Sequence, residues 1–201
     1  MFSCLGVAIA FSDFWTSETL TLTVPLLLYI HMMQKKNDLR MLSCVKVGLS
    51  WLLGYCGTFL YKWFLSTIFL GDNYFKIAYE KFASHTNVFG RLNSLKLNLN
   101  TLCFNKLSLN LNFSIFIVMF LVLLLFIYIY RKKDMEKYII SLFITAIIPY
   151  VRYLVLPGHS FGFAFFTYRA QLVLFIILLL LLNTIDINLI FKGVNKKNGQ
   201  K

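Results

Sequence analysis

Charged residues are missing from two stretches of this chain, at 113–130 and at 172–182. An α-helix rises about 1.5 Å per residue, so roughly 20 apolar residues cross the hydrocarbon core of a bilayer. Each stretch is followed by a basic cluster, the first beginning at Arg131 and the second at Lys192. A soluble domain of 201 residues would interrupt its apolar runs with charge more often. The sequence therefore predicts an integral membrane protein.

Several motifs of soluble enzymes are absent as well. The chain contains no P-loop, no HExxH and no GxGxxG sequence. It has neither a CxxC pair nor Cys and His residues at the spacing of metal ligands, so we expect no metal and no cofactor. Its four cysteines are isolated and fit the role of small apolar residues: Cys4, Cys44, Cys56 and Cys103. The amino terminus lacks a basic region, so a cleaved signal peptide is not predicted.

Positive charge is abundant but confined. The formal net charge is +12, and 12 of the 20 Lys and Arg residues lie in or beside the segments 35–46, 131–137 and 192–201. Short basic segments next to apolar runs are typical of cytoplasmic loops under the positive-inside rule. The charge therefore indicates a membrane topology, with membrane lipid as the partner, and nucleic acid is not expected as a partner.

The apolar runs predict an all-α fold with about five transmembrane helices in a single polytopic domain over residues 1–201. The spans are expected at about 19–33, 43–69, 113–130, 138–156 and 168–188. Residues 1–12 would extend only about 18 Å as a helix, too short to cross a bilayer. They resemble the outer half of a helix, so we expect a chain truncated at its amino terminus.

The basic segments orient these spans, with loops 34–42 and 131–137 and the carboxyl terminus in the cytoplasm and the segment 71–112 outside. Within that outer loop, the residues 74–84 have the spacing of an amphipathic helix lying on the membrane surface. Leucine alternates with polar residues at 95–100 and again at 107–112. This alternation fits two pairing strands, or equally a segment without fixed structure.

Several polar residues are expected near the outer ends of the spans. Phosphate recognition at the lipid–water boundary is the chemistry that suits them, because Arg pairs with phosphate oxygens in a bidentate manner and Lys offers a point charge. A carboxylate nearby could act as a general base towards a sugar hydroxyl. The alternative is that single residues only anchor helix ends at the interface. The candidate phosphate ligands are Lys62, Arg152, His159 and Arg169, and the candidate catalytic carboxylates are Asp13 and Glu18.

The chain resembles the carboxyl-terminal part of bacterial polytopic membrane proteins encoded with surface-polysaccharide genes, which are similar to C-type membrane glycosyltransferases. The resemblance lies in the segments 11–16 with Pro25, 51–55 with 62–63, 149–153, and 159–169. It implies a bacterial plasma-membrane protein that uses a polyprenyl-phosphate-linked sugar, or an inactive fragment of such an enzyme. Two other functions stay open: a transporter or flippase component, and a non-catalytic membrane scaffold.

Overall fold

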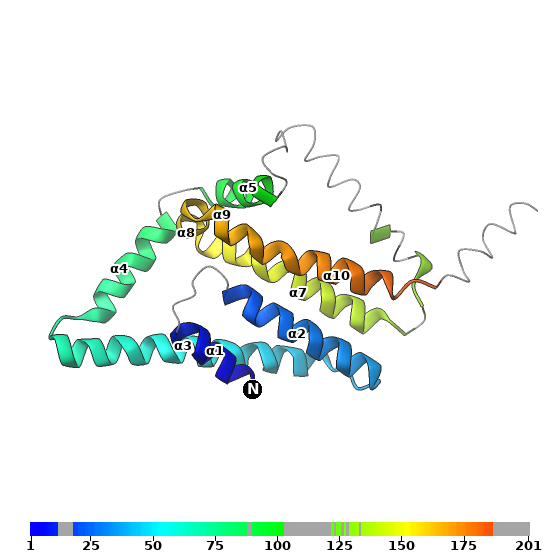
Figure 1. The fold of residues 1–201 in the computed structure, drawn as a ribbon, viewed down its shortest axis with the longest axis horizontal. Coiled ribbons are helices and arrows are strands. Elements are labelled where there is room, and N and C mark those ends of the chain that lie inside the picture. The colour runs from blue at the N-terminus through cyan, green and yellow to red at the C-terminus, as the bar shows by residue number, and fades with distance from the viewer. Residues whose placement is uncertain are drawn as a thin grey trace, which may run out of the picture.

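The computed structural model describes residues 1–11, 18–87, 90–102, 122, 124–125, 127, 129–132 and 134–186. Over these residues every regular element is a helix, which confirms the predicted all-α class. The elements, drawn in Figure 1, are α1 (Phe2–Phe11), α2 (Glu18–Lys35), α3 (Met41–Leu70), α4 (Tyr74–Asn87), α5 (Arg91–Leu102), α7 (Glu136–Val155), α8 (Pro157–Gly162), α9 (Ala164–Thr167), the 3-10 turn η1 (Tyr168–Gln171) and α10 (Leu172–Leu182).

Three helical segments are long and apolar enough to cross a membrane: α3 with 30 residues, α7 with 20, and the continuous segment Ala164–Leu182 with 19. They correspond to the predicted spans 43–69, 138–156 and 168–188. The predicted span 19–33 forms α2, whose threonines, His31 and terminal charges make it too polar for this set. The predicted span 113–130 lies largely outside the described residues, and the basic tail 192–201 lies wholly outside them.

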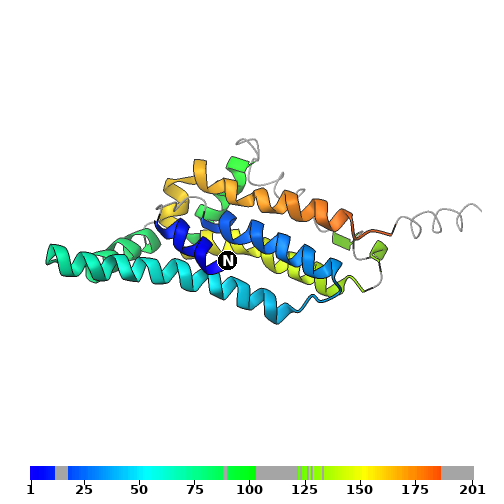
Figure 2. The same ribbon diagram turned by 60° about the horizontal axis from the view of Figure 1, so that its bottom comes forward.

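The core lies between α2, α7 and α10, which run side by side (Figures 1 and 2). Leu27, Leu142 and Val173 come from these three helices and are at most 2% exposed. Along α7 the opposite face carries Ile140, Ile144 and other large apolar side chains that are about half exposed. Apolar residues on both faces of a helix are expected where one face packs against protein and the other meets lipid.

Helix α1 packs parallel to α3 at very short range. A methyl group added at Gly6 would lie 2.3 Å from the Trp51 carbonyl oxygen, and one at Gly54 would lie 2.2 Å from the Ser3 carbonyl oxygen. The Ser3 and Ser50 hydroxyls lie 2.6 Å apart across the same contact. Small residues that allow backbones to approach are typical of helix pairs in membranes, where lipid competes for apolar side chains.

Helix α3 ends where turn chemistry predicts. Gly71 adopts a left-handed conformation with φ of 79°, which closes the helix without a Cβ clash. Asn73 then starts α4, because its side-chain oxygen accepts a hydrogen bond from the Lys76 amide at 3.1 Å. The predicted amphipathic helix is therefore present, and it runs obliquely from the end of α3 towards α8 (Figure 1). That it lies in the membrane surface stays a prediction.

The strand expected at 95–100, and the alternative of no fixed structure there, are both wrong. These residues form α5, in which Ser94 and Asn98 are fully buried one turn apart. Leu and Lys favour helices, and the segment has no β-branched residue before Thr101, so local propensity also opposes a strand. Burial of one polar face of the helix decided the conformation. The second alternating run, 107–112, lies outside the described residues.

Candidate functional site: a buried polar cluster

The site is built at the end of α7, where the chain turns back towards the bundle. Pro157 stands at the first position of α8, where its missing N–H removes no helical hydrogen bond. The six-residue helix α8 carries His159 and Ser160, and both are buried, at 6% and 0% exposure. Arg152 lies one helical turn before the end of α7, so these three side chains meet on the inner side of the turn.

Arg152 is the centre of the cluster. Its Nε donates a hydrogen bond to Glu18 Oε1 at the start of α2, forming an ion pair whose side chains are 7% and 10% exposed. Its Nη1 donates to Ser160 Oγ at 3.0 Å, and its Nη2 lies 3.1 Å from His159 Nδ1. Because the guanidinium can only donate, His159 Nδ1 is the acceptor, so the ring carries its proton on Nε2 and is neutral.

The hydrogen bonds continue from Ser160 to α5 and η1. Asn98 Nδ2 donates to the Ser160 carbonyl oxygen at 2.9 Å, and Asn98 Oδ1 accepts from the Thr167 hydroxyl at 2.6 Å. Gln171 Nε2 donates to the Asn98 carbonyl oxygen at 2.9 Å, and the Tyr153 hydroxyl donates to the Thr167 carbonyl oxygen at 2.7 Å. Such a network in a low-dielectric interior holds its members in one arrangement. Helices α2, α5, α7, α8 and α9 are thereby joined.

Two buried oxygens at the start of α2 are not satisfied by the described part of the chain. Glu18 Oε2 and Thr19 Oγ1 are both inaccessible to solvent and make no hydrogen bond to any residue that the structure describes. An unmade hydrogen bond on a buried group costs about 1–3 kcal/mol, and more on a charged one. A hydroxyl donor from a ligand or a water molecule would remove that cost.

The predicted site residues are only partly brought together. Arg152, His159 and Glu18 meet, as described above. Lys62 Nζ instead donates to the Ala10 and Phe11 carbonyl oxygens at 2.7 and 3.3 Å, where its charge complements the carboxyl end of α1. Arg169 is exposed, with its guanidinium 5.4 Å from the centre of the Phe166 ring. Asp13 lies outside the described residues.

The site also contains residues that sequence reasoning missed: Asn98, Ser160, Thr167 and Gln171. Gln171 could have been found from the sequence, because it directly precedes the apolar run 172–182 and its side-chain amide needs a hydrogen-bond partner there. Asn98 repeats Ser94 at the four-residue spacing of a helix face, but the alternation with leucine hid this.

The sequence-based interpretation also missed one motif that is known from serine hydrolases. Residues 158–162 read Gly-His-Ser-Phe-Gly, which matches the GxSxG pattern of serine hydrolases. In those enzymes the serine stands exposed on a strand-to-helix turn, hydrogen-bonded to a histidine. Here Ser160 is fully buried in a short helix, and its hydroxyl accepts a hydrogen bond from Arg152. The match therefore does not indicate a nucleophile.

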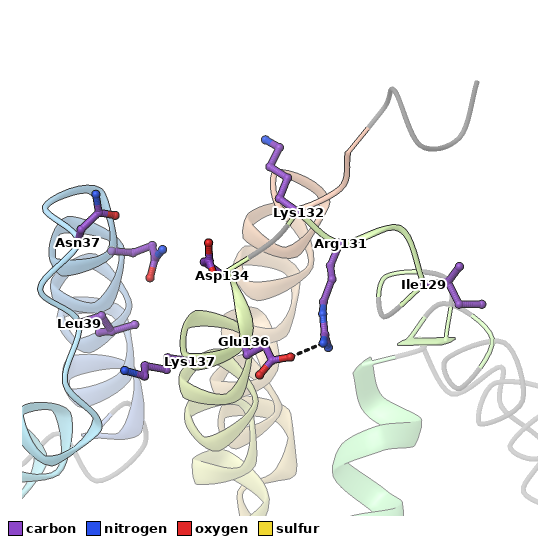
Figure 3. A pocket seen from close by; sticks show the side chains of 9 residues that line it. Asn37, Leu39, Ile129, Arg131, Lys132, Asp134, Glu136 and Lys137 are labelled. Carbon is purple, nitrogen blue, oxygen red and sulfur yellow. Dashed lines mark hydrogen bonds and ion pairs between the residues drawn. The ribbon is translucent and has the colours of Figure 1, made fainter. Parts of the chain in front are cut away.

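A second polar feature lies at the opposite end of the bundle. The loops between α2 and α3 and before α7 line an open pocket of about 890 Å³. Figure 3 shows Arg131 paired with Glu136 on one side of it, with Asn37 and Leu39 across from them. The two loops come from the basic segments 35–46 and 131–137, so the structure places these segments at the same end of the bundle. Which side of the membrane that end faces stays a prediction.

Comparison with known proteins gives no independent indication of function. A scan against protein-family models and searches of characterised proteins and solved structures find no match. Function is therefore inferred from the buried polar cluster itself.

Proposed function

We propose that this chain is a glycosyltransferase-like membrane protein of bacterial surface-glycan assembly that binds a lipid-linked phosphate at Arg152. One observation carries the proposal: a guanidinium, a carboxylate and an imidazole meet in the interior of an apolar helix bundle. Ionisable groups in such surroundings are expensive and by default mark a functional site. The cluster lies at one end of α7, as recognition of a headgroup requires (Figure 1).

The guanidinium offers a phosphate two positions. Nη1 and Nη2 donate to neutral acceptors, the Ser160 hydroxyl and the His159 imidazole, at 3.0 and 3.1 Å. A phosphate oxygen is a stronger acceptor, because charge-assisted hydrogen bonds are roughly twice as strong as neutral ones. Since His159 and Ser160 both stand on α8, a small displacement of this short helix opens both positions together. Glu18 meanwhile keeps the guanidinium oriented through Nε.

Glu18 supplies the base for transfer. An acceptor hydroxyl forms a bond from its oxygen to the anomeric carbon, while the bond from that carbon to the phosphate oxygen breaks. The electron pair of the broken bond stays on the phosphate, whose charge Arg152 stabilises. The hydroxyl proton passes to Glu18 Oε2, the carboxylate oxygen that has no partner among the described residues.

Binding and transfer can be tested separately on the full chain in lipid nanodiscs. With undecaprenyl phosphate as the probe, Arg152→Ala should weaken binding at least tenfold, since each charge-assisted contact contributes about 1.5–3 kcal/mol. Arg152→Lys should recover only part of it, because Lys cannot form the bidentate fork. Arg91→Ala, which removes an exposed arginine on α5, is the control and should bind normally. Equal binding by all four proteins would refute the phosphate site.

Glu18→Gln separates the role of Glu18 in orienting Arg152 from its role as the catalytic base. The amide can still accept from Arg152 Nε, so phosphate binding should change less than threefold. A glutamine cannot take a proton, so transfer of radiolabelled sugar from a polyprenyl phosphate to the glycan should fall at least a hundredfold. Transfer at the normal rate in this variant would exclude Glu18 as the base.

A non-catalytic scaffold is the alternative that one observation favours. The network from Arg152 to Asn98 and Gln171 is nearly complete without a ligand, so it could serve only to fix α5 and α8 on the bundle. If the chain is a scaffold, Arg152→Ala and Arg152→Lys should differ from the unaltered protein only in stability. Neither variant should then have an altered affinity for undecaprenyl phosphate.

A further inference from the structure

A small cavity lies between α2, α3 and α7. Its volume is about 160 Å³, and its walls are almost entirely apolar. Two hydroxyl groups reach it, but each is already bonded to its own helix: Ser141 Oγ donates to the Lys137 carbonyl oxygen at 2.8 Å and Thr145 Oγ1 to the Ser141 carbonyl oxygen at 2.9 Å. Apart from these hydroxyls and the Cys44 thiol, the cavity is lined by hydrocarbon, so it offers little to hold a water molecule.

The cavity continues the helix faces that carry the ion pair. On α7, Ile148 lines the cavity and stands four residues before Arg152, about 6 Å along the same face. On α2, Leu26 lines it and stands eight residues after Glu18, about 12 Å along the face of that helix. The cavity thus begins about one helical turn from Arg152 along α7 and about two turns from Glu18 along α2, and it extends away from both groups.

One side of the cavity is open to the surface of the bundle. Val45 and Ile144 form its rim and are 55% and 52% exposed. Gly48 on α3 also lines the cavity, and a Cβ added there would meet no atom within 4 Å. A hydrocarbon chain can therefore enter laterally from the lipid at Gly48, where no side chain blocks the opening.

We propose that this cavity binds the first part of the hydrocarbon chain of the lipid whose phosphate is held at Arg152. The inference rests on the proposed function for the headgroup and adds the subsite for its tail. Taking about 30 Å³ for a group of water size, the volume holds on the order of five methylene-sized groups. That is the size of one isoprene unit, so the cavity fits the phosphate-proximal unit of a polyprenyl chain.

Filling the cavity tests the tail subsite apart from the headgroup site. Gly48→Leu places a branched side chain into the space and should weaken binding of undecaprenyl phosphate at least tenfold. Binding of methyl phosphate, which has the headgroup and no chain, should be unchanged in this variant and lost in Arg152→Ala. Gly57→Leu is the matched control, because Gly57 is also on α3 with open space at its Cβ but does not line the cavity.

The outcomes distinguish the two proposals. If Gly48→Leu binds undecaprenyl phosphate as well as Gly57→Leu does while Arg152→Ala does not, the tail subsite is refuted and the phosphate site stands. If the unaltered protein binds neither probe, both are refuted. A polyprenyl phosphate carrying a diazirine on its first isoprene unit provides a second measurement on the unaltered protein. Cross-links should map to 41–48 and 141–148, and cross-links confined to α4 or α10 would overturn the assignment.

Discussion

Removing Arg152 would leave the Glu18 carboxyl group without its ion-pair partner in a nearly dry site. Both side chains are about one-tenth exposed or less, and the guanidinium bonds to α2 and α8 at once. Breaking one partner of a buried ion pair costs about 3–5 kcal/mol, whereas replacing both with apolar residues of similar size is often neutral. We therefore expect Arg152→Met to lower the free energy of unfolding by about 3–5 kcal/mol.

The double variant Glu18→Leu with Arg152→Met should recover most of that loss, to within about 1–2 kcal/mol of the unaltered protein. It should nevertheless bind no undecaprenyl phosphate, which separates the stability of the cluster from its function. Unfolding of the full chain in mixed micelles by added sodium dodecyl sulfate, followed by circular dichroism, measures each free energy.

An exposed pair provides the control. Arg40 pairs with Asp38 at 3.1 Å, with side chains 77% and 61% exposed, so Arg40→Met should cost less than about 1 kcal/mol. If Arg152→Met costs no more than Arg40→Met does, the Glu18–Arg152 pair is not buried in the folded protein and the reasoning about its energetics fails.

Three further predictions follow from the packing and the topology. Gly54→Leu should separate α1 from α3 and lower the free energy of unfolding by more than about 2 kcal/mol, because even a Cβ at this position would lie 2.2 Å from the Ser3 carbonyl oxygen. Gly57→Leu should leave the free energy of unfolding unchanged in the same titration, because its Cβ would meet no atom within 4 Å. In a cysteine-free background, an impermeant thiol reagent added to intact cells should label Lys81→Cys on α4 but not Asn37→Cys, and the reverse pattern would invert the topology. Spin labels along α4 should show membrane depth varying with the helical period, with Phe75 and Tyr79 deeper than Lys76 and Glu80; uniform exposure to water would mean that α4 does not lie at the interface.

The sequence by itself determined the features that depend on local pattern. Long apolar runs bounded by basic clusters predicted α3, α7 and the segment ending at α10, because spanning length and charge placement are properties of contiguous residues. Gly71 and the spacing of aromatic residues after it predicted the end of α3 and the presence of α4 for the same reason. Grouping Arg152 with His159 was also possible, since they stand seven residues apart around a proline turn.

Only the tertiary structure decided which partner each polar group has. Glu18 and Arg152 are 134 residues apart in the chain, and no local pattern connects a carboxylate at the start of one helix to a guanidinium near the end of another. Lys62 was expected in the same cluster from its depth along α3, but the close packing of α1 offers it carbonyl oxygens instead. The segment 95–100 is helical because Asn98 finds Ser160 and Thr167 across the bundle. Burial and hydrogen bonding between distant segments outweigh a period-two pattern, and they exist only once the helices have packed.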